Sequence, residues 1–385
     1  MHPLCIQQFW DIFHIRSYGY PQGAPLQTQH MKLNWKNLPR PIIALSPMAD
    51  MTDSAFCRTV KYVMSKSGAD VETRIANFVM FREMVSAEAV VRGNNKTLDM
   101  TEIHPDERPL VQQIFGSDPD VMAEATRIID REHNPEGFDI NMGCPVYKLV
   151  CNFNGASLMK EPERAAAIVK AMKAVTSKPI SVKIRLGWGD PTECFAFAKA
   201  LEEAGADLLT VHGRTRMQGY SGESDWEMIR KLKETVSIPI LANGDMFTAP
   251  LAMKALEHTK CDGILIARGA LGNPWIFAQI EEMLIGKSPK VISIEERVDT
   301  IRFHLGLHIE QYGEKAVTTF RKHLTWYLKG LDGAKKYKER LHTAPSREEV
   351  ETILEEMRLD PDMKDAIAHR DAAHPNAGER MKLTK

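Results

Sequence analysis

The chain lacks the short signatures of several common protein classes. None of its six cysteines lies in a Cys-x-x-Cys pair, the sequence His-Glu-x-x-His is missing, and no Gly-x-Gly-x-x-Gly opens the first strand-helix unit. These absences argue against a zinc site, a zinc protease and a Rossmann dinucleotide-binding fold. We therefore expect no bound metal. The scattered cysteines predict a reducing compartment, and we expect the protein in the cytoplasm.

Strong net charge and long apolar runs are missing as well. The formal net charge is −1, and charged residues make up 26% of the chain. No apolar run approaches the roughly 20 residues that a membrane-spanning helix needs. The composition thus argues against a membrane protein and a uniformly basic nucleic-acid binder, although net charge says nothing about a local basic face. We expect a monomer.

What the chain does have is a regular alternation of short apolar strands and amphipathic helices. The second predicted strand has a weak signal in the sequence, because charged residues interrupt its apolar residues. The segment 81–91 that follows it is predicted to be a helix or a lid. Counting that strand, eight strand-helix units predict an α/β fold, a (β/α)₈ TIM barrel, rather than an open sheet. The predicted strands are 42–45, 69–79, 110–116, 137–146, 179–186, 207–212, 239–243 and 262–267.

Four regions are predicted along the chain. Residues 1–38 form an extension expected to be poorly ordered, 39–290 the barrel, 291–358 a helical domain and 359–385 a polar tail. Within the helical domain, residues 315–340 hold eight Lys or Arg against two acidic residues. Such a basic helical face predicts binding of a polyanion, and the alternative is an ordinary solvated helix surface.

A turn with unusual residues ends the fourth strand. Gly143, Cys144 and Pro145 follow directly on the apolar run that carries Phe138 and Ile140. Pro145 restricts the backbone before it and Gly143 allows a sharp bend, so Cys144 should lie at the rim of the barrel. Because barrel active sites form at this rim, Cys144 is a candidate catalytic residue. The turn alone is equally compatible with a buried structural cysteine.

Polar side chains follow most of the other predicted strands. Each has a structural explanation by itself: Gln113 could cap a strand, Lys183 could extend along the surface, and His212 could be a core histidine. Together they would meet at one end of the barrel, which favours a functional site. The set comprises Ser46, Met48, Gln113, Asn141, Cys144, Lys183, Arg185, His212, Arg214, Asn243, Gly244, Asp245, Arg268 and Gly269.

Glycines after the last two strands predict a phosphate site. The segments 243–245 and 267–272 lie where barrels bind phosphate through backbone N–H groups, and Arg268 adds a cation. A phosphate there, with Lys183 and Gln113 deeper in the barrel, fits a flavin mononucleotide (FMN) across the barrel mouth. Lys183 would then face the pyrimidine edge of the flavin ring and stabilise negative charge on it.

Ten short segments occur in an order that is specific to one enzyme family. They are Ser-Pro-Met-Ala (46–49), Glu-Met-Val-Ser-Ala (83–87), Gln-Ile-Phe-Gly-Ser (113–117), Asp-Ile-Asn-Met-Gly-Cys-Pro (139–145), Gly-Ala-Ser-Leu-Met (155–159), Val-Lys-Ile-Arg-Leu-Gly (182–187), His-Gly-Arg-Thr-Arg (212–216), Asn-Gly-Asp (243–245), Ala-Arg-Gly-Ala-Leu-Gly-Asn-Pro-Trp (267–275) and Arg-Lys-His-x-x-Trp-Tyr-x-x-Gly (321–330). Over residues 41–341 the chain thereby resembles the tRNA-dihydrouridine synthases, which are FMN-dependent barrel enzymes. One departure is Arg82, where the family usually has Thr.

The resemblance implies reduction of the 5,6 double bond of specific uridines in tRNA, with NADPH reducing the FMN. It makes Cys144 the acid that protonates uracil C5, while the flavin N5 delivers hydride to C6. It assigns FMN binding to Pro47, Met48, Ala49, Gln113, Lys183, His212, Asn243, Gly244, Asp245, Ala267, Arg268 and Gly269. It assigns substrate binding to Asn141, Lys183, Arg185 and Arg214, and to Arg321 and Lys322 in the helical domain.

Two other functions share part of this pattern. A flavin barrel that acts on a free small molecule, such as a dihydroorotate or dihydropyrimidine dehydrogenase, would share the phosphate site and the lysine. It would have no use for the basic helical domain. An RNA-binding protein with an inactive barrel would have no need of Cys144, Lys183 and His212, and its purified form would not be yellow.

Overall fold

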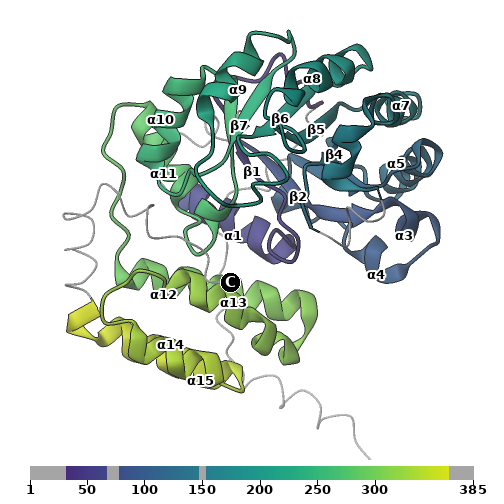
Figure 1. Cartoon of the computed structure of the whole chain (residues 1–385). Helices are drawn as coiled ribbons and strands as arrows, with labels where there is room; N and C mark the ends of the chain where they lie inside the picture. Colours follow the sequence, from purple (N-terminus) through teal and green to yellow (C-terminus); the bar gives the residue numbers. More distant parts are fainter. Residues whose placement is uncertain (1–31, 67–77, 147–152, 364–385) are drawn as a thin grey trace, which may run out of the picture. The chain divides into compact units, whose positions relative to one another are not determined.

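The predicted TIM barrel is confirmed. In the computed structural model, which describes residues 32–66, 78–146 and 153–363, eight parallel strands form a closed barrel in sequence order (Figure 1). The first and last strands pair in parallel and close it. The strands are β1 (Ile42–Leu45), β2 (Phe78–Ser86), β3 (Leu110–Phe115), β4 (Gly137–Met142), β5 (Ile180–Arg185), β6 (Leu208–His212), β7 (Ile240–Asn243) and β8 (Gly263–Ile266).

Helices between the strands cover the outside of the barrel. Their starts follow local signals: Asp118 caps one helix ahead of Pro119, and Thr248 caps another. No helix in the described residues is both long and apolar enough to cross a membrane. The helices are α1 (Ser54–Lys66), α3 (Ala87–Val91), α4 (Asn95–Asp99), α5 (Pro119–His133), α7 (Pro162–Lys173), α8 (Glu193–Glu203), α9 (Trp226–Lys233), α10 (Ala249–Thr259) and α11 (Ile276–Leu284).

The second strand lies later in the chain than predicted. β2 spans Phe78–Ser86, so most of the segment predicted as a helix or lid is strand, and only α3 is helical there. The predicted strand at 69–79 falls mostly outside the described residues. Arg82 interrupts the apolar run that would have marked β2. It is buried in an ion pair with Glu107 and donates to the Glu102 carbonyl oxygen at 3.2 Å, so the strand accommodates its charge.

The barrel interior is apolar at one end and polar at the other. Side chains of Ile42, Val79 and Leu265 pack inside with Trp35, whose ring stacks on Phe81 at 5.9 Å. Trp35 is 2% exposed, so the end of the region predicted as an extension belongs to the barrel core. Since alternate strand residues face the same side, the polar residues further along the strands collect at the carboxyl end.

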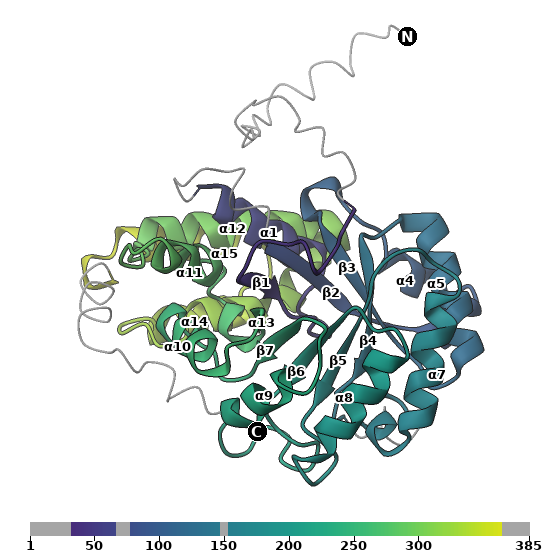
Figure 2. The ribbon, with the colours of Figure 1, turned by 90° about the horizontal axis from the view of Figure 1, so that it is seen from above.

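A layer of four helices packs beside the barrel (Figures 1 and 2). The helices are α12 (Ile294–Tyr312), α13 (Val317–Tyr327), α14 (Lys335–Thr343) and α15 (Arg347–Leu359). They share a core that includes Val63 and Trp275 of the barrel, and α12 packs against α1. At the barrel side, Gly272 has a φ of +66°, and a Cβ on it would lie 2.2 Å from the Trp326 backbone carbon. The two backbones therefore meet with no side chain between them.

Candidate active site

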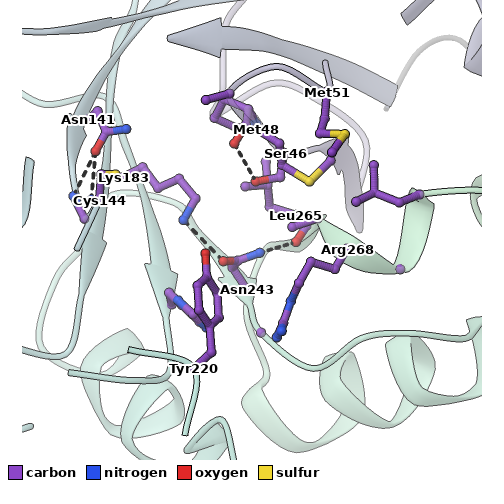
Figure 3. A pocket seen from close by; sticks show the side chains of 18 of the residues that line it. Ser46, Met48, Met51, Asn141, Cys144, Lys183, Tyr220, Asn243, Leu265 and Arg268 are labelled. Carbon is purple, nitrogen blue, oxygen red and sulfur yellow. Dashed lines mark hydrogen bonds between the residues drawn. The ribbon is translucent and has the colours of Figure 1, made fainter. Parts of the chain in front are cut away.

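A cavity of about 410 Å³ opens at the carboxyl end of the barrel (Figure 3). This volume suits a cofactor or drug-sized ligand. Loops after β1, β4, β6, β7 and β8 contribute to its wall, as do side chains on β2, β3 and β5, and Trp326 of α13 reaches it from the helical layer. Predicted site residues in the wall are Pro47, Met48, Ala49, Gln113, Asn141, Cys144, Lys183, Arg185, His212, Asn243, Gly244, Asp245, Ala267, Arg268 and Gly269. Arg214, Arg321 and Lys322 are not part of it.

A chain of hydrogen bonds holds the loop of Cys144. The Asn141 Oδ1 accepts from the backbone N–H groups of Gly143 at 3.2 Å and Cys144 at 3.0 Å. The Asn141 Nδ2 donates to Gln113 Oε1 at 2.9 Å, and Gln113 Nε2 donates to Asp139 Oδ2 at 2.5 Å. Figure 3 shows Asn141 beside Cys144. The amide of Asn141, which we predicted to bind substrate, thus fixes the position of the cysteine loop.

This chain of hydrogen bonds ends at the carboxylate of Asp139, which is buried inside the barrel. Asp139 Oδ1 accepts from the Ser181 hydroxyl at 2.6 Å. Burial raises the pKa of Asp139 to about 6, although its hydrogen bonds with Ser181 and Gln113 and the charge of Lys183 oppose this rise. At neutral pH Asp139 is ionised and only accepts hydrogen bonds. Gln113 must therefore present its N–H group to Asp139, and this orients every hydrogen bond from Asp139 to Cys144.

Arg185 links the Cys144 loop after β4 to the loop after β6. Its Nε donates to the Gly143 carbonyl oxygen at 2.8 Å, and its Nη1 donates to the carbonyl oxygens of Thr215 at 3.0 Å and Gly219 at 2.8 Å. Its guanidinium also lies 5.7 Å from the ring centroid of Tyr220. Arg185 therefore fixes the loops after β4 and β6 as well as lining the cavity.

Two nitrogen-containing side chains at the centre of the site have lowered pKa values. Burial, with the charge of Arg185, lowers the pKa of Lys183 to about 8. Its Nζ donates to Asn243 Oδ1 at 3.3 Å (Figure 3). Burial and the surrounding cations hold the pKa of His212 well below its usual value, so this imidazole is neutral. The site therefore presents a lysine cation and a neutral histidine side by side.

Glycine and two guanidinium groups form the end of the cavity after β7 and β8. Gly244 has a φ of +124°, and a Cβ on it would lie 2.2 Å from the Ser224 hydroxyl oxygen, so only glycine fits. Asp245 accepts from Arg214 Nη2 at 2.6 Å and from Arg268 Nη2 at 3.2 Å. One carboxylate between two guanidinium groups leaves a net positive charge beside the glycine. Arg214, predicted to bind substrate, is 2% exposed and bound to Asp245.

Comparison with known proteins places this site in a family. The model of the family described as "Dihydrouridine synthase (Dus)" matches residues 43–366. The chain belongs to this family. It is 37% identical over 337 residues to "Probable tRNA-dihydrouridine synthase 1" of Synechocystis sp., covering 87% of this chain and 89% of that protein. It is 38% identical over 294 residues to "tRNA-dihydrouridine synthase B" of Pasteurella multocida, covering 75% of this chain and 84% of that protein.

In this dihydrouridine synthase, the cations of the basic helical face differ in their partners. Arg321 Nη2 donates to the Ala344 carbonyl oxygen at 3.0 Å, and Lys322 Nζ donates to the Asp50 carbonyl oxygen. Lys336 and Arg340 form ion pairs with Asp360 and Glu356. Within the described part of the chain, no carboxylate pairs with four other cations of this face, namely Lys315, Lys329, Lys335 and Lys338.

One of these unpaired lysines, Lys329, lies near the cavity wall, and Lys338 lies within range of its charge. Lys329 Nζ lies 4.8 Å from the ring centroid of Trp326, which lines the cavity. Partial burial, and then the charge of Arg268, lowers the pKa of Lys329. Partial burial and the charge of Lys329 lower the pKa of Lys338. The dihydrouridine synthase thus holds Lys329 and Lys338 close to other cations, and no carboxylate among the described residues pairs with either of them.

Sequence reasoning missed several residues of the dihydrouridine synthase site. Asp139 and Ser181 could have been found from strand alternation, because they precede Asn141 and Lys183 by two positions and share their face. Trp326 lies in a helix beyond the barrel, and nothing local marks it as a cavity residue. Tyr220, Met84 and Phe247 also line the cavity and were not predicted.

Proposed function

We propose that this chain is a tRNA-dihydrouridine synthase that reduces the 5,6 double bond of uridines in tRNA. One observation carries the proposal: Cys144 shares a single cavity with Lys183 and Arg268 in a chain of the dihydrouridine synthase family. The named relatives support the same substrate.

The residues of the cavity fit FMN. Its volume of about 410 Å³ lies in the range of cofactor sites. Gly244 leaves room for a close approach to the backbone, and Arg268 supplies a cation for the phosphate. Lys183 and Gln113 would hold the polar edge of the ring. Met48 and Leu265 offer apolar contacts. When bound, FMN would supply the hydride, and we infer that NADPH reduces it.

The protein supplies the proton. Cys144 stands in the wall of the cavity, and its thiol proton would go to C5 of the uracil. Asn141 and Arg185 hold the loop on which the thiol stands, so the proton is presented at a fixed place. The charge of Lys183 would stabilise negative charge on the flavin ring beside Lys183.

A uridine in folded tRNA reaches this cavity only when it is extruded from the RNA. Extrusion costs a few kcal/mol, which phosphate contacts offset. Lys329 and Lys338, which lack carboxylate partners in the described residues, stand on the helical layer that forms one side of the cavity. We infer that this layer binds the tRNA backbone, including the predicted contacts of Arg321 and Lys322. We also infer that the enzyme acts as a monomer in the cytoplasm.

The test is incubation of unmodified tRNA with the purified protein, FMN and NADPH, followed by mass analysis of nuclease fragments. We expect a gain of two hydrogens at a uridine. A yellow protein that oxidises NADPH but leaves every uridine unchanged would contradict the proposal and favour the small-molecule flavin reductase.

A further inference from the structure

A second group of cations lies over an aromatic ring at the barrel rim. Lys160 Nζ lies 3.8 Å from the ring centroid of Trp188, and the Arg216 guanidinium carbon lies 4.7 Å from it. We call these three residues the Trp188 cluster. They come from the loops after β4, β5 and β6, so three separate segments of the chain meet there.

The two cations of the Trp188 cluster have no anionic partner in the part of the chain that the structure describes. The nearby carboxylates are engaged elsewhere. Glu193 accepts from the Trp188 backbone N–H at 2.5 Å, Asp190 accepts from Thr192 at 2.8 Å, and Glu161 pairs with Arg164 at 2.9 Å. In addition, the buried Nε of Arg216 has no hydrogen-bond partner among the described residues. Unpaired cations held at one place are suited to an anionic ligand.

The Trp188 ring restrains both cations. A lysine or arginine over a tryptophan face is attracted by the electrons of the ring, so less side-chain freedom is lost when a ligand binds. Backbone hydrogen bonds fix the loops themselves: the Arg216 N–H donates to the Gly187 carbonyl oxygen at 2.8 Å, and the Met217 N–H donates to that of Trp188 at 2.9 Å. The cluster is therefore partly organised before any ligand arrives.

The cluster lies across the cavity mouth from the helical layer. In a closed barrel of eight strands in sequence order, β5 stands opposite β1. The helical layer contacts the loops after β1 and β8, through Lys322 on Asp50 and Trp326 on Gly272. Figure 1 accordingly shows α8, which follows β5, on the far side of the barrel from α13. The cysteine loop joins the cluster to the site, because the Ala156 N–H donates to the Cys144 carbonyl oxygen at 3.0 Å.

We propose that the Trp188 cluster binds phosphates of the tRNA backbone on the side of the reacting uridine opposite the helical layer. This inference rests on the proposed function and adds a second contact to it. With cations on both sides of the mouth, the backbone is held on either side of the extruded nucleotide. Two phosphate contacts here offset part of the cost of extrusion.

The test measures tRNA affinity at several salt concentrations for the flavin-loaded protein and three variants. The double variant Lys160→Ala with Arg216→Ala should bind about tenfold more weakly at low salt, and the slope of log K against log salt should fall by about 1.5. Trp188→Leu keeps both charges, so its slope should stay as in the wild type while affinity falls about threefold. The control, Lys231→Ala with Lys254→Ala, removes two exposed cations of α9 and α10 and should change neither quantity.

Two results would overturn the inference. One is an unchanged affinity and salt slope in the Lys160→Ala, Arg216→Ala variant while the wild type forms dihydrouridine. The other is a loss of affinity with no change in slope, which would mean that the substitutions act through folding instead of phosphate contacts. Flavin content and melting temperature report folding independently. A wild type that neither binds nor reduces tRNA would refute the proposed function itself, and this inference with it.

Discussion

The Gln113 side-chain amide donates a hydrogen bond of 2.5 Å to the Asp139 carboxylate, and both residues are buried inside the barrel. An ionised carboxylate only accepts hydrogen bonds, so it determines which end of the Gln113 amide faces it. The other end then accepts from Asn141, and the Asn141 oxygen is left to hold the Cys144 backbone. The direction of every bond in this chain follows from the charge of one carboxylate.

Replacing Asp139 by Asn should therefore slow tRNA reduction without removing the flavin. The Asn amide can present an N–H group to Gln113, which turns the Gln113 amide and displaces Asn141. A misplaced reacting group can cost on the order of 100-fold in rate, so we expect a loss of tenfold or more. Single-turnover formation of dihydrouridine measures it, and a wild-type rate would show that Asp139 does not position the cysteine loop.

The same carboxylate predicts an acid limb in the pH profile. With a pKa near 6, Asp139 becomes protonated as the pH falls through this value, and the rate should fall with it. Ser181→Ala removes a hydrogen bond that lowers the pKa of Asp139, so its limb should move to higher pH. A merely structural role of Ser181 would lower the rate without moving the limb.

Lys183→Met should make the flavin-free protein more stable and abolish flavin binding. The pKa of Lys183 is lowered to about 8, so the folded state disfavours its charge. This cost is fully present below pH 8 and declines as the pH rises from about 8 towards the unfolded value near 10.4. At pH 7 we expect a gain of about 1–2 kcal/mol in urea unfolding, because solvent in the cavity reduces the cost. Equal stability of the two proteins would contradict this.

Cys144→Ala should separate binding from chemistry. The alanine keeps the backbone N–H that donates to Asn141, so the loop, the flavin and the bound tRNA should stay in place. Dihydrouridine formation should fall by about 100-fold or more, the typical contribution of a general acid. Flavin absorbance and tRNA affinity serve as controls. Normal turnover by this variant would remove Cys144 from the mechanism.

Lys329→Ala with Lys338→Ala should weaken tRNA binding and lower its salt slope by about 1.5 if each lysine contacts one phosphate. The matched control is Lys336→Ala with Arg340→Ala, which removes two cations of the same face that are paired with Asp360 and Glu356. Because those charges are already balanced, the control should change the slope less. Equal effects of the two double variants would show that pairing does not decide which cations meet the RNA.

Three buried histidines predict that the helical layer is sensitive to acid. Burial lowers the pKa of His323 to about 3 and of His308 to about 4, and holds that of His304 well below its usual value. The unfolded side chains titrate near 6.5, so protons bind the unfolded state first and the free energy of unfolding falls as the pH drops from about 6.5 towards 4. The nearby Lys322 strengthens the effect, and Asp53, 3.8 Å from His308, opposes it.

His323→Phe isolates one of these titrations. The His323 ring stacks on Phe56 with 6.1 Å between centroids, and its Nε2 has no hydrogen-bond partner within residues 32–66, 78–146 and 153–363, so phenylalanine keeps the packing. At pH 5 the variant should exceed the wild type by up to about 2 kcal/mol, and the excess should shrink towards pH 7. Urea unfolding between pH 5 and pH 7 measures it. A constant difference across this range would exclude titration of His323.

The barrel and most of the cavity wall could be predicted from the sequence. The signals for them, which are alternation within strands, glycine turns and the short family segments, are each read from residues close together in the chain. β2 was misplaced because Arg82 looks like a surface residue until its partner Glu107, 25 positions away, is known. The role of Asn141 depends on Gln113 of the neighbouring strand β3 and on the backbone N–H groups of Gly143 and Cys144 in the turn after β4. Arg214 likewise looks like a substrate ligand in the sequence, and only folding brings Asp245 against it.

The contact between Gly272 and the backbone of Trp326 has a consequence for evolution. Any side chain at Gly272 would push α13 away from the barrel, so the angle between the helical layer and the cavity depends on a loop of the barrel. If this angle selects the uridine, exchanging helical domains between relatives will transfer the choice of position only when the segment around Gly272 is exchanged with them. The helical domain and the barrel segment around Gly272 are then inherited together.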